Sequence, residues 1–117
     1  MTREFVMMPE FDRQWQKMGL GDDELRELQI AMLQNPKAGD VIPGTKKLRK
    51  IRIAFKGQGK SGSGRVAYVD FTVHEKIYFI TAYPKSKKDN LSQAERNEIA
   101  GMIVRLEHGL KEQENIK

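Results

Sequence analysis

One stretch decides the fold of this chain: Leu48-Arg49-Lys50-Ile51-Arg52-Ile53-Ala54-Phe55-Lys56. In an extended strand, successive side chains point to opposite faces. Three apolar residues of the stretch therefore share one face, and most of its basic residues share the other. We predict a β-strand over residues 48–56 with an apolar back (Ile51, Ile53, Phe55) and a mainly cationic front (Lys50, Arg52, Ala54, Lys56).

The charge of the chain is concentrated around this stretch. The 117 residues carry a formal net charge of +5. Residues 46–88 hold twelve basic and two acidic side chains, a sum of +10, whereas residues 1–45 sum to −3 and residues 89–117 to −2. A positive surface of this density is suited to a polyanionic partner. We consider RNA the best candidate.

Hydrophobic periodicity predicts the remaining elements. Apolar residues recur at helical spacing before the stretch and after the last strand, and at strand spacing between them. A Ser-x-x-Glu capping box formed by Ser92 and Glu95 marks the start of the final helix. In chain order we predict a strand Arg3–Met8, a helix Glu10–Met18, a helix capped by Asp22 and Asp23 that ends at Asn35-Pro36, strands Leu48–Lys56, Arg65–Val73 and Lys76–Tyr83, and a C-terminal helix.

These elements predict an α+β fold in β-α-α-β-β-β-α order. The sheet is expected to be small and antiparallel, with the helical hairpin packed on one face. A chain of 117 residues is long enough for one core but not for two. We therefore expect a single domain over residues 1–117.

Several function classes find no support in the residues. Without cysteine, the chain has no disulfides and no thiolate metal site. His74 and His108 lack carboxylates at ligand spacing, so we expect no metal site and no cofactor. Arg3, Glu4 and Pro9 flank the short segment Phe5–Met8, which therefore does not form a signal-peptide core. The uncharged stretch Ile77–Pro84 is too short to cross a bilayer. We expect a cytoplasmic protein.

The segment Ala54–Ser61 comes close to the phosphate-binding loop of nucleoside triphosphatases. That loop works by opening a helix whose N-terminus holds phosphate. Here Gly62-Ser63-Gly64 and a β-rich segment follow instead. We interpret the segment as a flexible hairpin loop that carries Lys60, with ATP or GTP binding as a minor alternative.

The cationic strand face is the strongest candidate site. Like charges two residues apart on one face lie roughly 7 Å from each other and repel, which favours a functional reason for keeping them. Arg65 opens the next strand and adds a planar group suited to phosphate. The plain alternative is a solvated edge strand guarded by charge. The wider set of predicted RNA-binding residues is Lys46, Lys47, Arg49, Lys56, Lys60, Lys87 and Lys88, with Tyr83 as a platform on which a base could stack.

Three motifs in this order resemble a known superfamily. They are Leu48-Arg49-Lys50-Ile51-Arg52, Gly64-Arg65-Val66-Ala67-Tyr68 and Tyr83-Pro84-Lys85-Ser86-Lys87-Lys88. Together with the order of elements, they are similar to the RelE/ParE toxins, and most similar to the HigB-type branch of RelE toxins. The resemblance covers nearly the whole chain. It implies the toxin of a type II toxin–antitoxin system that cuts mRNA in the ribosomal A site without metal, with a HigA-like, DNA-binding antitoxin as its partner.

The resemblance also implies a set of catalytic residues. The basic pair on the second strand of the RelE fold corresponds to Lys50 and Arg52, the arginine after the loop to Arg65, and the basic residue after the last strand to Lys85. We expect Lys50 to act as the base, the two arginines to hold the phosphate, and Lys85 to act as the acid. Three departures from the common RelE pattern bear on this assignment: Leu91 in place of a tyrosine, Arg52 in place of a second lysine, and a longer loop at Gly57–Gly64.

Two alternatives stay open on the sequence. A ParE-like gyrase poison shares the fold but performs no RNA cleavage, so it would not depend on Lys50, Arg52 and Arg65. A non-catalytic RNA- or ribosome-binding domain would keep salt-sensitive RNA binding without cutting.

Overall fold

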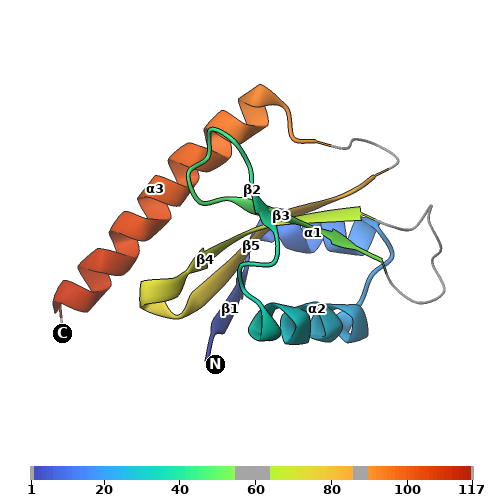
Figure 1. Ribbon diagram of the computed structural model, residues 1–117, viewed down its shortest axis with the longest axis horizontal. Coiled ribbons are helices and arrows are strands. Elements are labelled where there is room, and N and C mark those ends of the chain that lie inside the picture. Colours follow the sequence, from blue (N-terminus) through green and yellow to red (C-terminus); the bar gives the residue numbers. More distant parts are fainter. Residues whose placement is uncertain (1, 55–63, 86–89, 117) are drawn as a thin grey trace.

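The computed structural model describes residues 2–54, 64–85 and 90–116 and confirms the α+β fold class. Its elements follow the predicted order, with one additional short strand and a 3₁₀ turn (Figure 1). They are β1 (Glu4–Met7), α1 (Pro9–Lys17), α2 (Asp22–Gln34), β2 (Asp40–Val41), β3 (Arg49–Ile53), β4 (Gly64–Phe71), η2 (Thr72–His74), β5 (Lys76–Pro84) and α3 (Gln93–Ile116).

The sheet is mixed, not purely antiparallel. Its strand order is β1-β5-β4-β3-β2. The pairs from β2 to β5 are antiparallel, as predicted, whereas β1 runs parallel to β5 with Glu4 opposite Lys76. Side-chain alternation shows that a strand exists but not its pairing direction, which explains the difference. Ion pairs hold β1 in place: Arg3 Nε lies 2.9 Å from Asp70 Oδ1, and Lys76 Nζ lies 3.0 Å from Glu4 Oε1.

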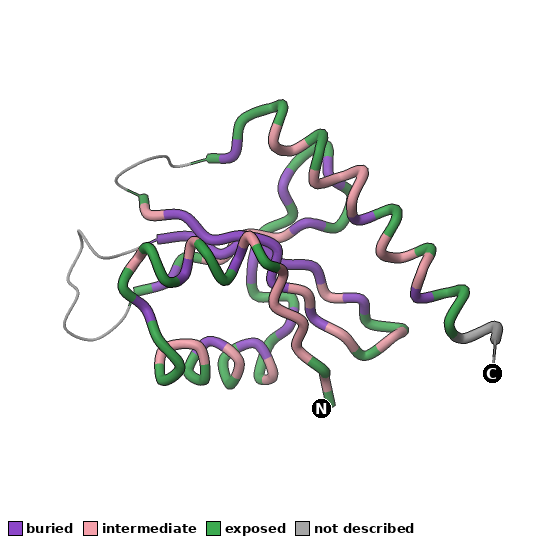
Figure 2. Tube along the Cα trace, turned by 180° about the vertical axis from the view of Figure 1, so that it is seen from behind, coloured by how far each residue is buried: buried purple, intermediate pink, exposed green. Residues whose placement is uncertain are grey.

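Helices cover the sheet on both faces, and each face has its own core. The hairpin α1–α2 packs on one face (Figure 1). The opposite face is covered by α3. The buried residues lie mainly in β4 and β5, between the two layers (Figure 2). The first core contains Phe11, Trp15, Leu28, Met32, Ile53, Val66, Tyr68, Ile77 and Phe79, and the second contains Leu48, Ala67, Val69, Phe71, Tyr83, Leu91, Ile103 and Leu110.

The two predicted helix starts have different outcomes. The capping box before α3 is confirmed: Ser92 N donates to Glu95 Oε1 at 2.8 Å, and Glu95 N donates to Ser92 Oγ at 3.1 Å. The cap predicted at Asp22 and Asp23 is wrong, because Gly21 is the cap residue and its N–H donates to Glu24 Oε1 at 2.7 Å. The two aspartates lie in the first turn of α2, where negative charge is favourable.

The described part of the second predicted strand ends earlier than expected. β3 stops at Ile53, and residues 55–63 lie outside the described residues. Within the described part of the chain, no helix combines the length and apolar character needed to cross a membrane.

Candidate functional site

The register between β3 and β4 brings three of the predicted catalytic residues to one face. Arg52 lies directly opposite Arg65, and Lys50 lies opposite Ala67, two residues further along. Directly opposed residues of an antiparallel pair point to the same side. This face is the one that α3 partly covers, since Ala67 packs in its core. The predicted cationic front is therefore formed by two adjacent strands.

The three side chains of this face differ in exposure. Arg52 is exposed and Lys50 is half-buried. Arg65 is 9% exposed, and one of its terminal nitrogens donates to the Gly64 carbonyl at 3.2 Å. A guanidinium held in this way is preorganised, which favours a fixed role toward an anion over a mobile surface role.

The chain passes very close to itself where β4 begins. A Cβ on Gly64 would lie 2.8 Å from the Tyr83 carbonyl oxygen, so a residue with a side chain cannot stand there without a shift. Gly64 pairs with Pro84, and Arg65 pairs with Tyr83. The glycine thus permits the close strand pairing on which the position of Arg65 depends.

Tyr83 does not provide the stacking platform that the sequence predicts. Its side chain is 3% exposed and belongs to the core under α3. It lies opposite Arg65 on the same face of the sheet, with its ring packed inward. The sequence around Tyr83, at the end of β5, is compatible with either a buried or an exposed side chain. Its burial depends on packing against α3, which the local sequence does not show.

Asn90 is a site residue that the sequence analysis missed. The Lys50 ammonium donates a hydrogen bond to Asn90 Oδ1, across 40 positions of sequence. Asn90 stands immediately before Leu91, which is buried in the core, and Ser92, which caps α3. The two residues that follow Asn90 are therefore anchored, one by burial in the core and the other by the helix cap. The only sequence signal was its place two residues before Ser92, which begins the capping box.

Lys85 follows the end of β5 at the same end of the sheet. Its predecessor Pro84 pairs with Gly64, so the chain leaves the sheet beside the start of β4. Lys85 itself is exposed. Four other predicted RNA-binding residues, Lys56, Lys60, Lys87 and Lys88, lie outside the described residues.

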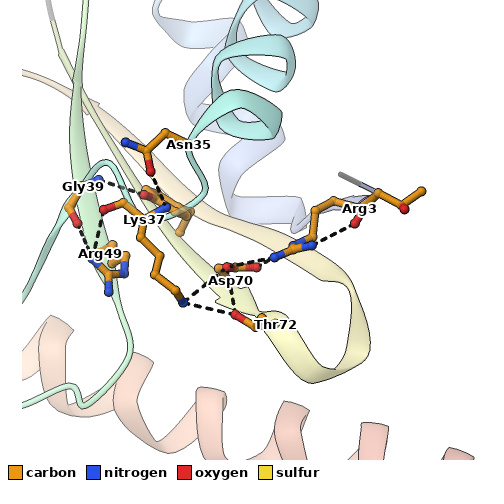
Figure 3. A network of polar contacts seen from close by, with 9 residues as sticks. Arg3, Asn35, Lys37, Gly39, Arg49, Asp70 and Thr72 are labelled. Atoms are coloured by element: carbon orange, nitrogen blue, oxygen red, sulfur yellow. Dashed lines mark hydrogen bonds and ion pairs between the residues drawn. The ribbon is translucent and has the colours of Figure 1, made fainter.

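The remaining predicted RNA-binding residues lie toward the other end of the sheet. Lys46 and Lys47 belong to the loop before β3, and Lys47 forms an ion pair with Glu107 of α3. Arg49 lies opposite Tyr68 and donates to the Gly39 carbonyl at 2.7 Å (Figure 3). Arg49 therefore points away from the face that carries Lys50. The structure divides the basic residues of the sequence into two groups.

Burial and ion pairing shift the pKa of a few groups. The hydrogen bond and charge of Asp70 raise the pKa of Arg3, against the desolvation of its guanidinium. Burial raises the pKa of Tyr68, whose hydroxyl oxygen accepts a hydrogen bond from Gly39 N at 2.9 Å. The Arg13 and Gln14 side chains lower the pKa of Glu10. Among the described residues, no group of three or more histidine, aspartate or glutamate side chains is placed to hold a metal ion.

A sequence model of the family described as the RelE toxin of the RelE/RelB toxin–antitoxin system matches residues 6–114. The chain belongs to the RelE toxin family. Its structure is also similar to that of a double mutant of the E. coli toxin RelE in the free state, with a TM-score of 0.54 and 15% sequence identity. The match covers 75% of this chain and 88% of that chain. At this identity, the likeness concerns the fold.

Membership in the RelE family gives the departure at Leu91 a physical meaning. Where the common RelE pattern has a tyrosine, Leu91 is 5% exposed and packs in the core under α3. An alkyl side chain cannot transfer a proton or donate a hydrogen bond. Leu91 itself therefore cannot take part in proton transfer.

Proposed function

We propose that this RelE-family chain is a ribosome-dependent mRNA endoribonuclease that inhibits translation by cutting mRNA in the ribosomal A site. The observation that carries the proposal is the register of β3 and β4, which sets Arg52 opposite Arg65 with Lys50 beside them on one face. Two arginines and a lysine on one face suit the binding and stabilisation of a reacting phosphodiester. Family membership supports a toxin that pairs with an antitoxin.

The proposed chemistry uses the RNA itself as the nucleophile. The ribose 2′-oxygen attacks the adjacent phosphorus, a 2′,3′-cyclic phosphate forms, and the bond from phosphorus to the 5′-oxygen breaks. In the proposed assignment Lys50 accepts the 2′-hydroxyl proton and Lys85 protonates the departing 5′-oxygen. Arg52 and Arg65 stay charged throughout and stabilise the charge that develops on the phosphoryl oxygens.

The ribosome is expected to supply much of the rate enhancement. Correct orientation of a reacting group can lower a barrier by about 7–11 kcal/mol. The described site is a sheet face that α3 covers only in part, with the exposed residues Arg52 and Lys85 at its border. A face of this kind needs a second surface to hold the message in line for attack, and we propose that the A site provides it.

The proposal extends to the partner, the branch and the domain. We propose that a HigA-like, DNA-binding antitoxin neutralises the chain, that the chain belongs to the HigB-type branch, and that residues 1–117 form one toxin domain in the cytoplasm. The three-motif resemblance and the basic sheet face support this proposal, because an acidic segment of an antitoxin would complement that face.

The test is tightly induced expression in a bacterium, followed by mapping of mRNA 5′ ends by primer extension. The wild-type chain is expected to give new ends in phase with codons, in translated messages only. Lys50→Ala/Arg52→Ala is expected to abolish them, since it removes two charges from the face without altering the buried Arg65. Lys17→Ala/Arg26→Ala is the matched control, because it removes two exposed charges from α1 and α2.

The outcomes separate the competing functions. Growth arrest without new mRNA ends would overturn the nuclease and favour a gyrase poison, which supercoiling assays would then reveal. Cleavage that survives in Lys50→Ala/Arg52→Ala would remove this face from the chemistry. Equal amounts of folded protein, checked by circular dichroism, are required for each comparison.

A further inference from the structure

A cationic cavity lies between the loop before β3, the end of the β4–β5 hairpin and the C-terminal half of α3. Its volume is about 550 Å³, and residues of all three segments line it. Five of the lining residues are lysines or an arginine and two are carboxylates, so the formal charge of the lining is +3. The basic residues are Lys37, Lys46, Lys47, Arg49 and Lys111.

The two carboxylates of the cavity are already engaged with other groups. Asp70 is 1% exposed at its side chain and pairs with Arg3, a residue that does not line the cavity, at 2.9 Å and with Lys37 of the cavity at 3.7 Å (Figure 3). Glu107 pairs with Lys47. Neither carboxylate is therefore available to neutralise Lys46 and Lys111, which are both exposed. The cavity keeps an excess of positive charge.

The backbone holds this charge in place. Lys46 has a φ of 67°, in the left-handed region that costs a side-chain-bearing residue roughly 1–2 kcal/mol. Hydrogen bonds fix the loop around it: Lys47 N donates to Thr45 O at 2.8 Å, and Ile42 N donates to Leu48 O at 2.7 Å. On the opposite wall, Lys37 Nζ donates to Thr72 Oγ1 at 3.2 Å. These hydrogen bonds fix the backbone of the loop and the position of the Lys37 side chain.

This cavity is separate from the pair formed by Arg52 and Arg65. Phe71 lines the cavity, and it follows Arg65 by six residues along β4. At about 3.3 Å per residue this is roughly 20 Å. One phosphodiester group cannot contact both places. Arg49, the cavity residue nearest to Arg52 along β3, is three residues or roughly 10 Å away, so a phosphate in the cavity is a different group from the one that is cut.

We propose that the cavity binds the phosphate backbone of ribosomal RNA and orients the toxin on the ribosome, an inference that rests on the proposed function. Lysine heads are point charges that suit phosphates without reading a sequence. Phe71 is 3% exposed and offers no face for base stacking. The Arg49 Nη1 donates to the Gly39 and Lys37 carbonyls, which restrains the guanidinium and disfavours a bidentate contact with a base edge. These features favour a structured RNA with dense phosphates over a single-stranded message.

Binding to free RNA tests the inference without any cleavage. Fluorescence anisotropy with a labelled RNA hairpin, at several salt concentrations, compares the wild-type chain with Lys46→Ala/Lys111→Ala. The loss of two phosphate contacts is expected to weaken hairpin binding about ten-fold and to lower the salt slope by about 1.4–1.8. Lys17→Ala/Arg26→Ala removes the same charge elsewhere and is expected to bind like the wild type.

Ribosomes provide the second measurement. Lys46→Ala/Lys111→Ala is expected to raise the ribosome concentration needed for half-maximal mRNA cleavage, with the rate at saturation unchanged. Lys50→Ala/Arg52→Ala is expected to lower the saturated rate, whatever its effect on ribosome binding. If the wild type cuts no mRNA, the proposed function fails, and the hairpin measurement still decides whether the cavity binds RNA.

Three results would overturn the inference. One is unchanged hairpin affinity and salt slope in Lys46→Ala/Lys111→Ala. Another is a loss confined to single-stranded RNA of equal length, which would make the ligand a segment of the message. The third is a loss of binding to polyglutamate with hairpin binding intact, which would make the cavity a docking site for an acidic protein segment.

Discussion

The buried hydroxyl of Tyr68 shows how a single polar atom holds the sheet to its edge. Tyr68 is fully buried in the core under α1 and α2, and its oxygen accepts a hydrogen bond from Gly39 N. A Cβ at Gly39 would lie 2.5 Å from the Lys50 carbonyl oxygen. The segment before β2 therefore runs directly against β3. The Tyr68 hydroxyl oxygen is the acceptor for the backbone N–H of Gly39 in this segment.

We predict that Tyr68→Phe lowers the free energy of unfolding by about 1–3 kcal/mol at neutral pH, because Gly39 N–H loses its buried acceptor. The variant should also respond less to alkaline pH. Burial raises the pKa of Tyr68 in the folded state above its unfolded value near 10. The folded state then binds more protons than the unfolded state, so stability falls as pH rises through 10 toward the folded pKa.

Urea unfolding at pH 7 and above pH 10 measures both effects. The two proteins differ only in this hydroxyl, so the difference between wild type and variant isolates the tyrosine. An equal loss of stability with pH in the two proteins would show that this hydroxyl does not contribute to the alkaline response.

Single residues were predictable from sequence where alternation alone decides their direction. Lys50 and Arg52 share a face because they are two residues apart in a strand, and the register adds Arg65. Asn90 was missed because its contact with Lys50 joins positions 40 residues apart. Tyr83 was placed wrongly because burial under α3 is a tertiary property.

The start of α3 connects helix stability to the candidate site. Ser92 and Glu95 cap the helix through two reciprocal hydrogen bonds. The residue just before the cap is Asn90's neighbour Leu91, so the same short segment fixes the acceptor of the Lys50 hydrogen bond. A helix cap and a site residue are therefore two residues apart.

We predict that Ser92→Ala costs about 1 kcal/mol of stability, the usual value of a lost N-cap. It should also lower the rate of mRNA cleavage, because the chain around Asn90 loses its anchor. Chemical unfolding and ribosome-dependent cleavage measure the two effects. Gln93→Ala is the control, since an exposed first-turn residue usually changes stability by no more than about 0.5 kcal/mol. A normal cleavage rate in Ser92→Ala would separate the cap from the site.

Whole elements were predicted well where the hydrophobic period is clear, and less well where pairing decides. The helices and the three central strands follow from periods of 3.6 and 2. The two-residue strand β2 was not predicted, since Asp40–Val41 shows no alternation and becomes a strand only by pairing with β3. The parallel direction of β1 likewise comes from its partner β5.

The distribution of charge over the whole molecule differs from its distribution in the sequence. The basic segment 46–88 is continuous in the chain. In the structure, alternation along β3 sends Lys50 and Arg52 to one face, while Arg49 joins the cavity with Lys37 and Lys111 from acidic flanks. Folding therefore distributes one basic segment over two surfaces. The sequence predicted the charge but not this division.

Two separate surfaces predict additive effects on ribosome binding. Sites more than about 7–10 Å apart that share no partner usually combine within about 0.5 kcal/mol. We therefore expect Arg52→Ala and Lys111→Ala to weaken binding independently, so that the double variant shows the product of the two fold-changes. Both residues are exposed, which leaves the fold intact. Cosedimentation with ribosomes at fixed salt measures the four proteins of the cycle. A coupling above about 1 kcal/mol would mean that one RNA segment contacts both residues, and the two surfaces would then act as a single site.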